Sequence, residues 1–216
     1  PGTADWQGIL LLGGQPFDET AGVVVNAAWD VTRSHLPSGT TRWSGSRKLP
    51  RDLVIPVGAE LVVEAGSRLG FTSVDIGRSG QFPELTELVV EGRLQVDATA
   101  AMPATFTLAS GRPDSVWYGV RLKDGAELSA RHLNAENGVV TIGGEVGPSD
   151  SLLLLDSRLS NIAGYGLRLT VNGIAEVSRS TFSRHPLNGV YVEGSGTLFL
   201  KNSRIIENGR EGVFLG

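Results

Sequence analysis

The sequence predicts an all-β fold in which one chain coils into stacked parallel strands, a parallel β-helix. The last third of the chain, Leu152 to Leu215, repeats at a spacing of 23 residues without a gap. Within each repeat, apolar residues alternate with polar ones, which is the period of a β-strand, and no helical stripe is present. A fixed period of this size is typical of stacked repeats, in which each unit buries its apolar face only against its neighbours.

The repeat is visible as columns of three equivalent residues. The columns are Leu152/Ala175/Leu198, Leu154/Val177/Leu200, Ser157/Ser180/Ser203, Leu159/Phe182/Ile205, Gly166/Gly189/Gly212, Leu167/Val190/Val213 and Leu169/Val192/Leu215. Each repeat holds two alternating apolar pairs, a single apolar residue between them, and Ser, Asn or Gly at the bends. These features predict three short strands in each turn of about 23 residues.

Upstream of the repeat, the same alternation predicts two further turns. Apolar pairs occur at Leu53/Ile55, Leu61/Val63 and Leu69/Phe71, and then at Leu88/Val90, Leu94/Val96 and Phe106/Leu108. Residues 72–86 and 109–116 are rich in Ser, Gly and Pro, so we expect loops that project from the stack.

Residues 1–48 are less regular, and we expect an N-terminal cap with a lead-in strand, followed by the β-helix over 49–216. Asp5–Gly14 favours a strand. The segment Asp18–Ser34 is compatible with a capping helix or with a strand, because its valines favour one and its alanines the other. A solenoid has to cover its open end, and this segment is the natural cover.

Three segments carry a family resemblance. NGVYVEGSGTLFLKNSRIIENGREGVFL (188–215) resembles a coil motif of the right-handed parallel β-helix family of the pectate-lyase-like type. VIPVGAELVVEAG (54–66) resembles the first coils of bacterial surface β-helix proteins, and WYGVRLKDGAELSARHLNAENGVV (117–140) resembles a further coil. The left-handed β-helix of hexapeptide acyltransferases is the nearest alternative, but its six-residue apolar period is absent.

The resemblance implies a right-handed, single-stranded coil in a secreted or cell-surface bacterial protein, commonly associated with carbohydrate. We therefore expect an extracellular or surface location, a polysaccharide as partner, and further domains of the same parent protein. Because the chain starts at Pro1 without Met, we expect it to be an excised or processed piece.

Composition excludes several other classes. The net charge of −4 is slightly acidic, so the composition does not indicate the basic surface typical of proteins that bind nucleic acid. No apolar run approaches the roughly 18 residues that suggest membrane insertion. The absence of Cys excludes disulfides and thiolate metal sites.

The sequence contains no recognisable catalytic constellation. Adjacent strands lie about 4.8 Å apart, so residues one repeat apart are neighbours. Glycosidases need two carboxylates roughly 5 to 9.5 Å apart, and no Asp or Glu pair with that offset occurs between 150 and 216. Opposite charges stand there instead, Asp156 beside Arg179 and Arg184 beside Glu207, which we expect to be surface ion pairs.

No cofactor motif or metal-ligand spacing is present, and His35, His132 and His185 are isolated from one another. The acid cluster that holds Ca²⁺ in lyases of the resembled family is also missing, as are the Asp-Pro-His and Gly-His-Asp motifs of its epimerases and hydrolases. We therefore expect no catalytic residue, no metal and no cofactor.

One candidate binding surface remains, an outward column of Arg121, Arg168, Tyr191 and Phe214. Aromatic rings and guanidinium groups in a row can stack on sugar rings and hydrogen-bond their hydroxyl or carboxylate groups. Alternatively, the rings pair across strands for structural reasons. Leu153 and Phe199 on a second face suggest contact with another domain.

Two functions follow from these observations. The first is a scaffold or glycan-contacting module. The alternative is a polysaccharide lyase or hydrolase whose acids lie in the loops or beyond residue 216. The loop candidates for such acids are Asp75, Glu84, Asp114 and Asp124.

Overall fold

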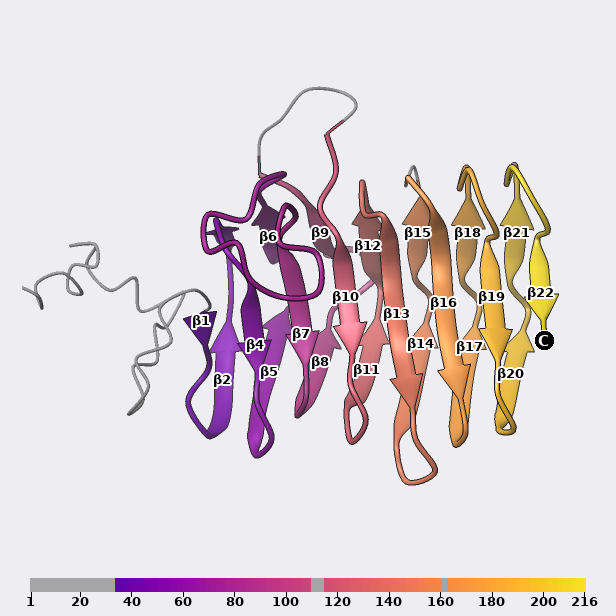
Figure 1. Cartoon of the computed structure of the whole chain (residues 1–216), viewed down its shortest axis with the longest axis horizontal. Helices are drawn as coiled ribbons and strands as arrows, with labels where there is room; N and C mark the ends of the chain where they lie inside the picture. Colours follow the sequence, from indigo (N-terminus) through magenta and orange to yellow (C-terminus); the bar gives the residue numbers. More distant parts are fainter. Residues whose placement is uncertain (1–33, 110–114, 161–162) are drawn as a thin grey trace, which may run out of the picture.

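The computed structural model describes residues 34–109, 115–160 and 163–216. These residues form strands and turns with no α-helix. The strands stack into three parallel sheets, and consecutive strands along the chain pass from one sheet to the next (Figure 1). The fold is therefore a parallel β-helix, as the repeat predicts.

The first sheet has eight strands: β1 (Ser34–His35), β4 (Leu53–Ile55), β7 (Glu87–Val90), β10 (Gly119–Leu122), β13 (Val140–Val146), β16 (Tyr165–Val171), β19 (Val190–Glu193) and β22 (Val213–Leu215). The second sheet has seven strands: β2 (Gly39–Trp43), β5 (Ala59–Glu64), β8 (Arg93–Asp97), β11 (Glu127–Arg131), β14 (Ser151–Leu155), β17 (Ile174–Ser178) and β20 (Thr197–Lys201). The third sheet also has seven strands: β3 (Ser46–Leu49), β6 (Arg68–Phe71), β9 (Ala104–Leu108), β12 (Leu133–Glu136), β15 (Arg158–Ser160), β18 (Thr181–Ser183) and β21 (Arg204–Ile206).

The register confirms the predicted columns. Leu152 pairs with Ala175 and Ala175 with Leu198 in the second sheet. In the third sheet, Leu159 pairs with Phe182 and Phe182 with Ile205. Because each pair is separated by one repeat, the period of the sequence is the circumference of the coil.

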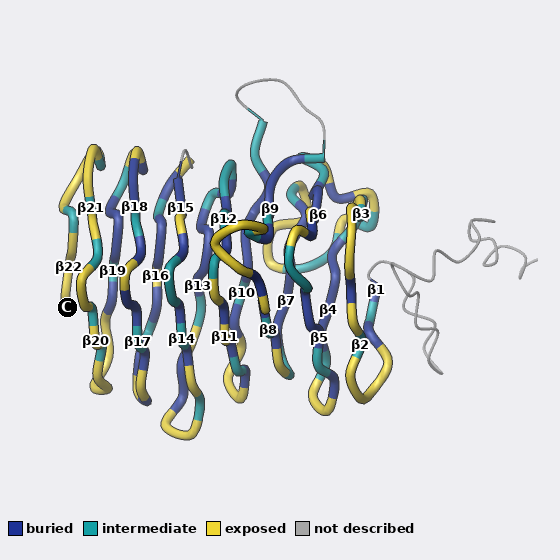
Figure 2. Tube along the Cα trace, turned by 180° about the vertical axis from the view of Figure 1, so that it is seen from behind, coloured by how far each residue is buried: buried dark blue, intermediate teal, exposed yellow. Residues whose placement is uncertain are grey.

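The core runs along the coil axis. The apolar pairs predicted from Leu53 to Leu108 all point inward and are buried, and Phe71 stacks on Trp117 with ring centroids 3.9 Å apart. Figure 2 shows buried residues throughout the central coils and exposed residues at the turns and over β20–β22. In this last coil the inward-facing Leu215 is 68 % exposed, because no strand covers it among the described residues.

The coil begins before the predicted boundary at residue 49. Strands β1, β2 and β3 lie within residues 34–48 or reach Leu49, and they pair in register with β4, β5 and β6. The alternation was hard to detect there because Leu36, Trp43 and Leu49 are the buried apolar residues in a stretch whose other positions are mostly polar. The predicted strand at 5–14 and the ambiguous segment 18–34 lie, except for Ser34, outside the described residues.

The loop at 72–86 contains no strand, as predicted, but it does not project from the stack. It folds back across the front of β4 and β7 (Figure 1). Val54 and Val89, which point outward from these strands, are each only 1 % exposed. Of the second predicted loop, residues 110–114 lie outside the described part of the chain.

Candidate functional site

The predicted binding column exists on the outer face of the first sheet, with one interruption. Strand register aligns Arg121 with Gly143, Gly143 with Arg168, Arg168 with Tyr191, and Tyr191 with Phe214. The inward neighbours of Tyr191, Val190 and Val192, are buried, so the alternation of the strand turns Tyr191 outward. Sequence analysis did not assign Gly143 to the column, because the loop between β13 and β14 makes that coil longer than 23 residues.

The aromatic half of the column packs against itself. The rings of Tyr191 and Phe214 stack with their centroids 4.8 Å apart and their planes 5° apart. Tyr165, which sequence analysis did not identify, packs edge-on against Tyr191 at 5.6 Å. The faces that Tyr191 and Phe214 turn toward each other are therefore covered and are not open to a sugar ring.

These rings position a cation. The Arg168 guanidinium carbon lies 5.2 Å from the ring centre of Tyr165 and 5.7 Å from that of Tyr191. Contacts of this kind hold a guanidinium by electrostatic attraction to the ring faces. Within the described part of the chain, no carboxylate lies within ion-pairing distance of Arg168. Its charge is therefore available to an anionic group.

A groove lies where the column lacks a side chain. It has a volume of about 180 Å³ and is lined by Gln81, Tyr118, Arg121, Val140, Gly143, Gly144, Glu145, Arg168, Leu169, Thr170 and Glu193. A Cβ at Gly143 would lie 2.6 Å from Cγ1 of Val140, so only glycine fits at this point of the floor. Arg121 and Arg168 flank the floor from the two neighbouring strands.

The two arginines differ in how they are held. The Nε of Arg121 donates to Oε2 of Glu87 at 2.7 Å, and the Arg121 side chain is 12 % exposed. The other oxygen of Glu87, Oε1, accepts the amides of Gln81 and Phe82 at 2.8 and 2.7 Å. Arg121 is therefore a fixed wall whose charge is largely neutralised, whereas Arg168 is the free cation of the groove.

The groove also contains two acids that sequence analysis missed. Glu145 pairs in register with Thr170, and Thr170 with Glu193. Two strand spacings separate Glu145 from Glu193, which is about 9.5 Å. The hydroxyl of Tyr191 donates to Oε2 of Glu193 at 3.1 Å, and this hydrogen bond raises the pKa of Tyr191. The pair was missed because Glu145 lies before residue 150, outside the regular repeat in which acid pairs were predicted to be absent.

Of the acids proposed from the loops, Asp75 and Glu84 are neighbours through their backbones, where the amide of Asp75 donates to the carbonyl oxygen of Glu84 at 3.4 Å. Asp75 is buried and its carboxylate accepts the amides of Gly77 and Ser79 in its own loop. Glu84 is exposed in the same loop, and Asp124 lies at the exposed turn after β10. Asp114 lies outside the described residues. The buried Asp75 carboxylate and the exposed Glu84 side chain therefore do not form an acid pair, and Asp124 lies at a separate turn.

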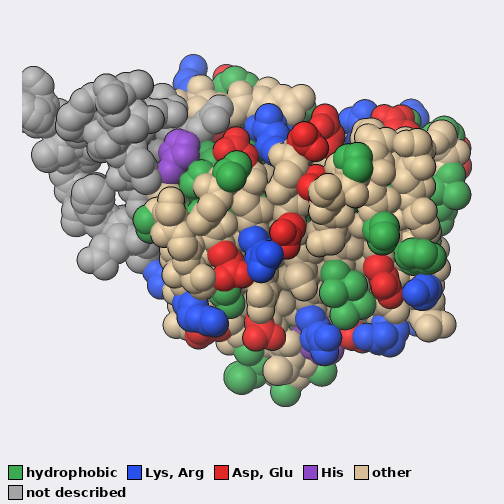
Figure 3. All heavy atoms as spheres, turned by 90° about the horizontal axis from the view of Figure 1, so that it is seen from below, with side chains coloured by type: hydrophobic (Ala, Val, Ile, Leu, Met, Phe, Trp, Pro, Cys, Tyr) green, Lys and Arg blue, Asp and Glu red, His purple; other side chains and the backbone are tan. Residues whose placement is uncertain are grey.

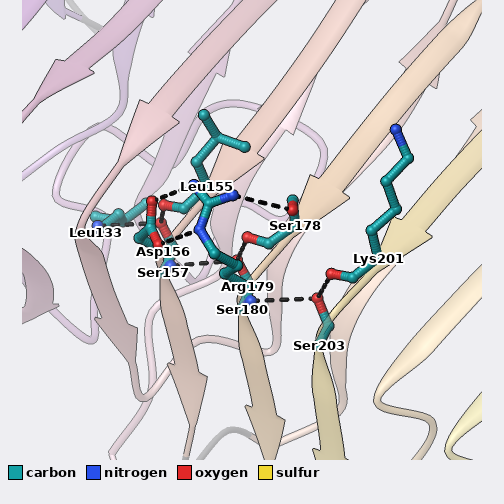
Figure 4. A network of polar contacts seen from close by, with 9 residues as sticks. All are labelled: Leu133, Leu155, Asp156, Ser157, Ser178, Arg179, Ser180, Lys201 and Ser203. Atoms are coloured by element: carbon teal, nitrogen blue, oxygen red, sulfur yellow. Dashed lines mark hydrogen bonds and ion pairs between the residues drawn. The ribbon is translucent and has the colours of Figure 1, made fainter.

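The first predicted ion pair, Asp156 and Arg179, lies away from the groove, at the corner between the second and third sheets. Arg179 contacts both carboxylate oxygens of Asp156 at 2.7 Å (Figure 4). Beneath it, the amide of Ser157 donates to Oγ of Ser180, and the amide of Ser180 donates to Oγ of Ser203. The column of serines is thus a hydrogen-bonded ladder. The second predicted pair, Arg184 and Glu207, is not formed, although both side chains are described.

Other surfaces carry less chemistry. A second hollow, of about 330 Å³, lies near Thr40, but its Arg93 is already paired with Glu60 and Glu127. On the second sheet, Phe199 is 43 % exposed, and Glu176 separates it from Leu153. Figure 3 shows the lower surface of the coil, where acidic and basic side chains are intermingled and apolar groups are small and separate.

Among residues 34–109, 115–160 and 163–216, no cluster of three His, Asp or Glu side chains has the arrangement of a metal site. In the same ranges, no helix has the length and apolar character needed to cross a bilayer.

Comparison with known proteins supports the fold. Residues 118–216 match the family described as right handed beta helix region. Neither the curated proteins nor the solved structures contain a significant match to the chain. Together with the three parallel sheets, the family match identifies the fold as a right-handed parallel β-helix.

Proposed function

We propose that this β-helix is a glycan-contacting module that binds an acidic polysaccharide on the outer face of its first sheet. The observation that supports the proposal is the groove at Gly143, flanked by Arg121 and Arg168. Its volume of about 180 Å³ suits a single sugar ring, and the linear sheet allows a chain to continue along the column. Secretion or surface display of the protein is part of this proposal.

The feature of the groove that favours a carboxylated or sulfated sugar is Arg168, since Arg121 is paired with Glu87. Arg168 presents a planar guanidinium whose paired N–H groups match the oxygens of a carboxylate. Thr170 and Gln81 add neutral hydrogen-bonding groups, and Glu145 and Glu193 on the far side accept sugar hydroxyls. Because the site is shallow, we expect a dissociation constant on the order of 0.1 to 1 mM for one site.

A glycan array followed by titration of the acidic hits tests the proposal. Arg168→Ala should weaken binding by about tenfold or more, because a charge-assisted hydrogen bond contributes about 1.5 to 3 kcal/mol. Arg158→Ala removes an exposed arginine from the third sheet and is the matched control. Binding should also weaken as salt is added.

Two results would contradict the proposal. An array without hits favours a structural scaffold. Binding that is equally strong with Arg168→Ala excludes the groove as the contact surface. The double variant Tyr191→Ala/Phe214→Ala tests the contribution of the aromatic rings separately. It removes the contact of Arg168 with the Tyr191 ring but leaves the charge of the groove unchanged.

A second candidate function is hydrolysis of the bound glycan. The observation that favours it is the acid pair Glu145 and Glu193, which line the groove from strands two positions apart in the sheet, with Thr170 between them. Incubation with acidic polysaccharides should then release reducing ends, and either Glu145→Gln or Glu193→Gln should abolish the release while binding persists. Absence of new reducing ends from glycans that bind would leave binding as the function.

A further inference from the structure

The loop at 72–86 is attached to the sheet through buried carboxylates. Asp52, Asp75 and Glu87 are each at most 1 % exposed. The Asp75 carboxylate accepts the amides of Gly77 and Ser79 at 2.9 and 2.7 Å. Glu87, at the start of β7, accepts the amides of Gln81 and Phe82. Four loop amides thus point at two acids.

Asp52 connects the loop to the sheet. Its Oδ1 accepts the amide of Glu87 at 2.8 Å, and its Oδ2 accepts the hydroxyl of Ser79 at 2.7 Å. The same hydroxyl lies 3.4 Å from Oδ2 of Asp75. Space is tight, because a Cβ at Gly80 would lie 2.7 Å from Oδ2 of Asp52 and 2.8 Å from Oε1 of Glu87.

Two neighbouring acids oppose the ionisation of Asp52. Arg121 pairs with Glu87, and Asp75 and Glu87 both repel a charge on Asp52. A buried carboxylate near two others is costly to ionise. Because Asp75 belongs to the loop and the closed loop excludes water, a proton added to this cluster relieves more repulsion while the loop is closed.

We propose that loop 72–86 is a pH-responsive wall of the groove, held closed more firmly when the cluster of Asp52, Asp75 and Glu87 takes up a proton. A protonated Asp52 can keep the Glu87 amide on Oδ1 and donate from Oδ2 toward the Ser79 hydroxyl or Asp75. Closure of the loop then no longer buries a negative charge on Asp52 beside those of Asp75 and Glu87.

The direction follows from linkage. Burial is the main cause that raises the pKa of Asp52 from 3.8 to about 6, partly offset by the hydrogen bonds from Glu87 and Ser79. A group with a higher pKa in the closed state favours closure below its open-state pKa, and this contribution is lost as pH rises through the closed-state value. The wall therefore tightens on acidification below about pH 6.

The loop reaches the groove through two residues: Gln81 lines it, and Phe82 stacks on Tyr118 with centroids 4.2 Å apart. The amides of both residues also donate to Glu87 of β7, which holds Arg121. Acidification should thus pre-order one wall of the binding site. This consequence for glycan affinity rests on the proposed function, whereas the closure of the loop does not.

Hydrogen exchange of the chain without glycan tests the closure. The amides of Gly77, Ser79, Gln81 and Phe82 are followed at about pH 7.5 and about pH 5.0 as protection factors, which remove the intrinsic pH dependence of exchange. The linkage between pKa 3.8 and about 6 predicts at most about a tenfold rise in protection on acidification. Amides of β16 and β17 report any global change.

Asp52→Asn is the decisive variant, because the amide mimics the protonated acid. It should show high protection at both pH values. Glu84→Gln, an exposed acid of the same loop, is the matched control and should behave like the wild type. Two other titratable or charged residues lie near Asp52: His35, which pairs in register with Val54, and Arg51, which precedes Asp52 in the chain. Asp52→Asn leaves both of them in place, so a pH response that persists in this variant belongs to them and not to Asp52.

Unchanged protection in the wild type, or a rise of the same size in Asp52→Asn, would overturn the proposal. If Asp52→Asn does not fold, carboxyl NMR of the wild type replaces it, and a titration midpoint of Asp52 near 4 would be contradictory. If loop protection rises on acidification while glycan affinity stays unchanged, the pH-dependent closure of the loop is supported and its effect on the binding site is contradicted.

Discussion

Asp156 and Arg179 occupy the same corner of successive coils, and their side chains form a bidentate ion pair with both distances at 2.7 Å. Both residues have a left-handed backbone with φ of 50°. The hydrogen bond from Arg179 holds the pKa of Asp156 below its ordinary value. His132 and Asn202 occupy the equivalent corner in neighbouring coils, with φ of 53° and 50°. The corner conformation is thus set by the coil and not by residue type.

Arg179→Ala should raise the pKa of Asp156 toward its ordinary value, and carboxyl NMR titration measures the change. A lowered acid pKa stabilises the fold above the unfolded value and loses that effect as pH falls through the folded value. Because the pair is exposed, the loss of stability should be small. Arg184→Ala, an unpaired corner arginine, should leave the titration of Asp156 unchanged.

Leu154→Ala should reduce the free energy of unfolding by about 2 to 4 kcal/mol, because Leu154 is fully buried in the second sheet. Leu200→Ala, in the same column, should cost clearly less, since the last coil leaves Leu200 partly exposed. Chemical denaturation compares the two variants. Equal costs would contradict the placement of Leu200 at an uncovered end.

Gly189→Val should destabilise the coil by about 1 to 3 kcal/mol through overpacking. A Cβ at Gly189 would lie 2.6 Å from Cγ2 of Ile205 and 3.0 Å from the carbonyl oxygen of Gly212. The cause is close approach, since φ at Gly189 is not in the left-handed region. Gly212→Val is the control, because the nearest atom there is 3.3 Å away. A thermal midpoint of Gly189→Val equal to that of the wild type would refute this packing.

His185 should make the fold acid-sensitive. Burial lowers its pKa from 6.5 to about 4, while its Nε2 lies 3.2 Å from the carbonyl oxygen of Leu159. Between these two pKa values the unfolded chain binds a proton at His185 and the folded chain does not. The free energy of unfolding therefore falls as pH drops from about 6.5 to about 4, by up to about 3 kcal/mol.

Denaturation midpoints at about pH 7 and about pH 4.5 measure this loss in the wild type. His185→Gln should flatten the dependence, whereas His132→Gln, at a half-buried corner, should retain it. A wild-type dependence that persists in full with His185→Gln would assign the acid sensitivity to other groups.

The sequence by itself determined the coil. The spacing of 23 residues and the alternation at Leu152, Leu154, Leu167 and Leu169 establish three strands per turn, because inward positions in stacked strands must be apolar at every coil. The same register placed Arg168, Tyr191 and Phe214 in one outward column, and the structure confirms that alignment.

Only the tertiary structure showed how the side chains of this column are oriented and what they contact. Register gives positions, but ring orientation depends on packing, so the stacking of Tyr191 on Phe214 and the entry of Tyr165 could not be foreseen. The groove at Gly143 depends on a coil of unequal length, which breaks the fixed offset on which the columns were built. The return of loop 72–86 over Asp52 depends on the contact of Ser79 with Asp52, 27 residues apart in the sequence. No periodic signal announces such a contact, because burial and hydrogen bonding hold the loop there.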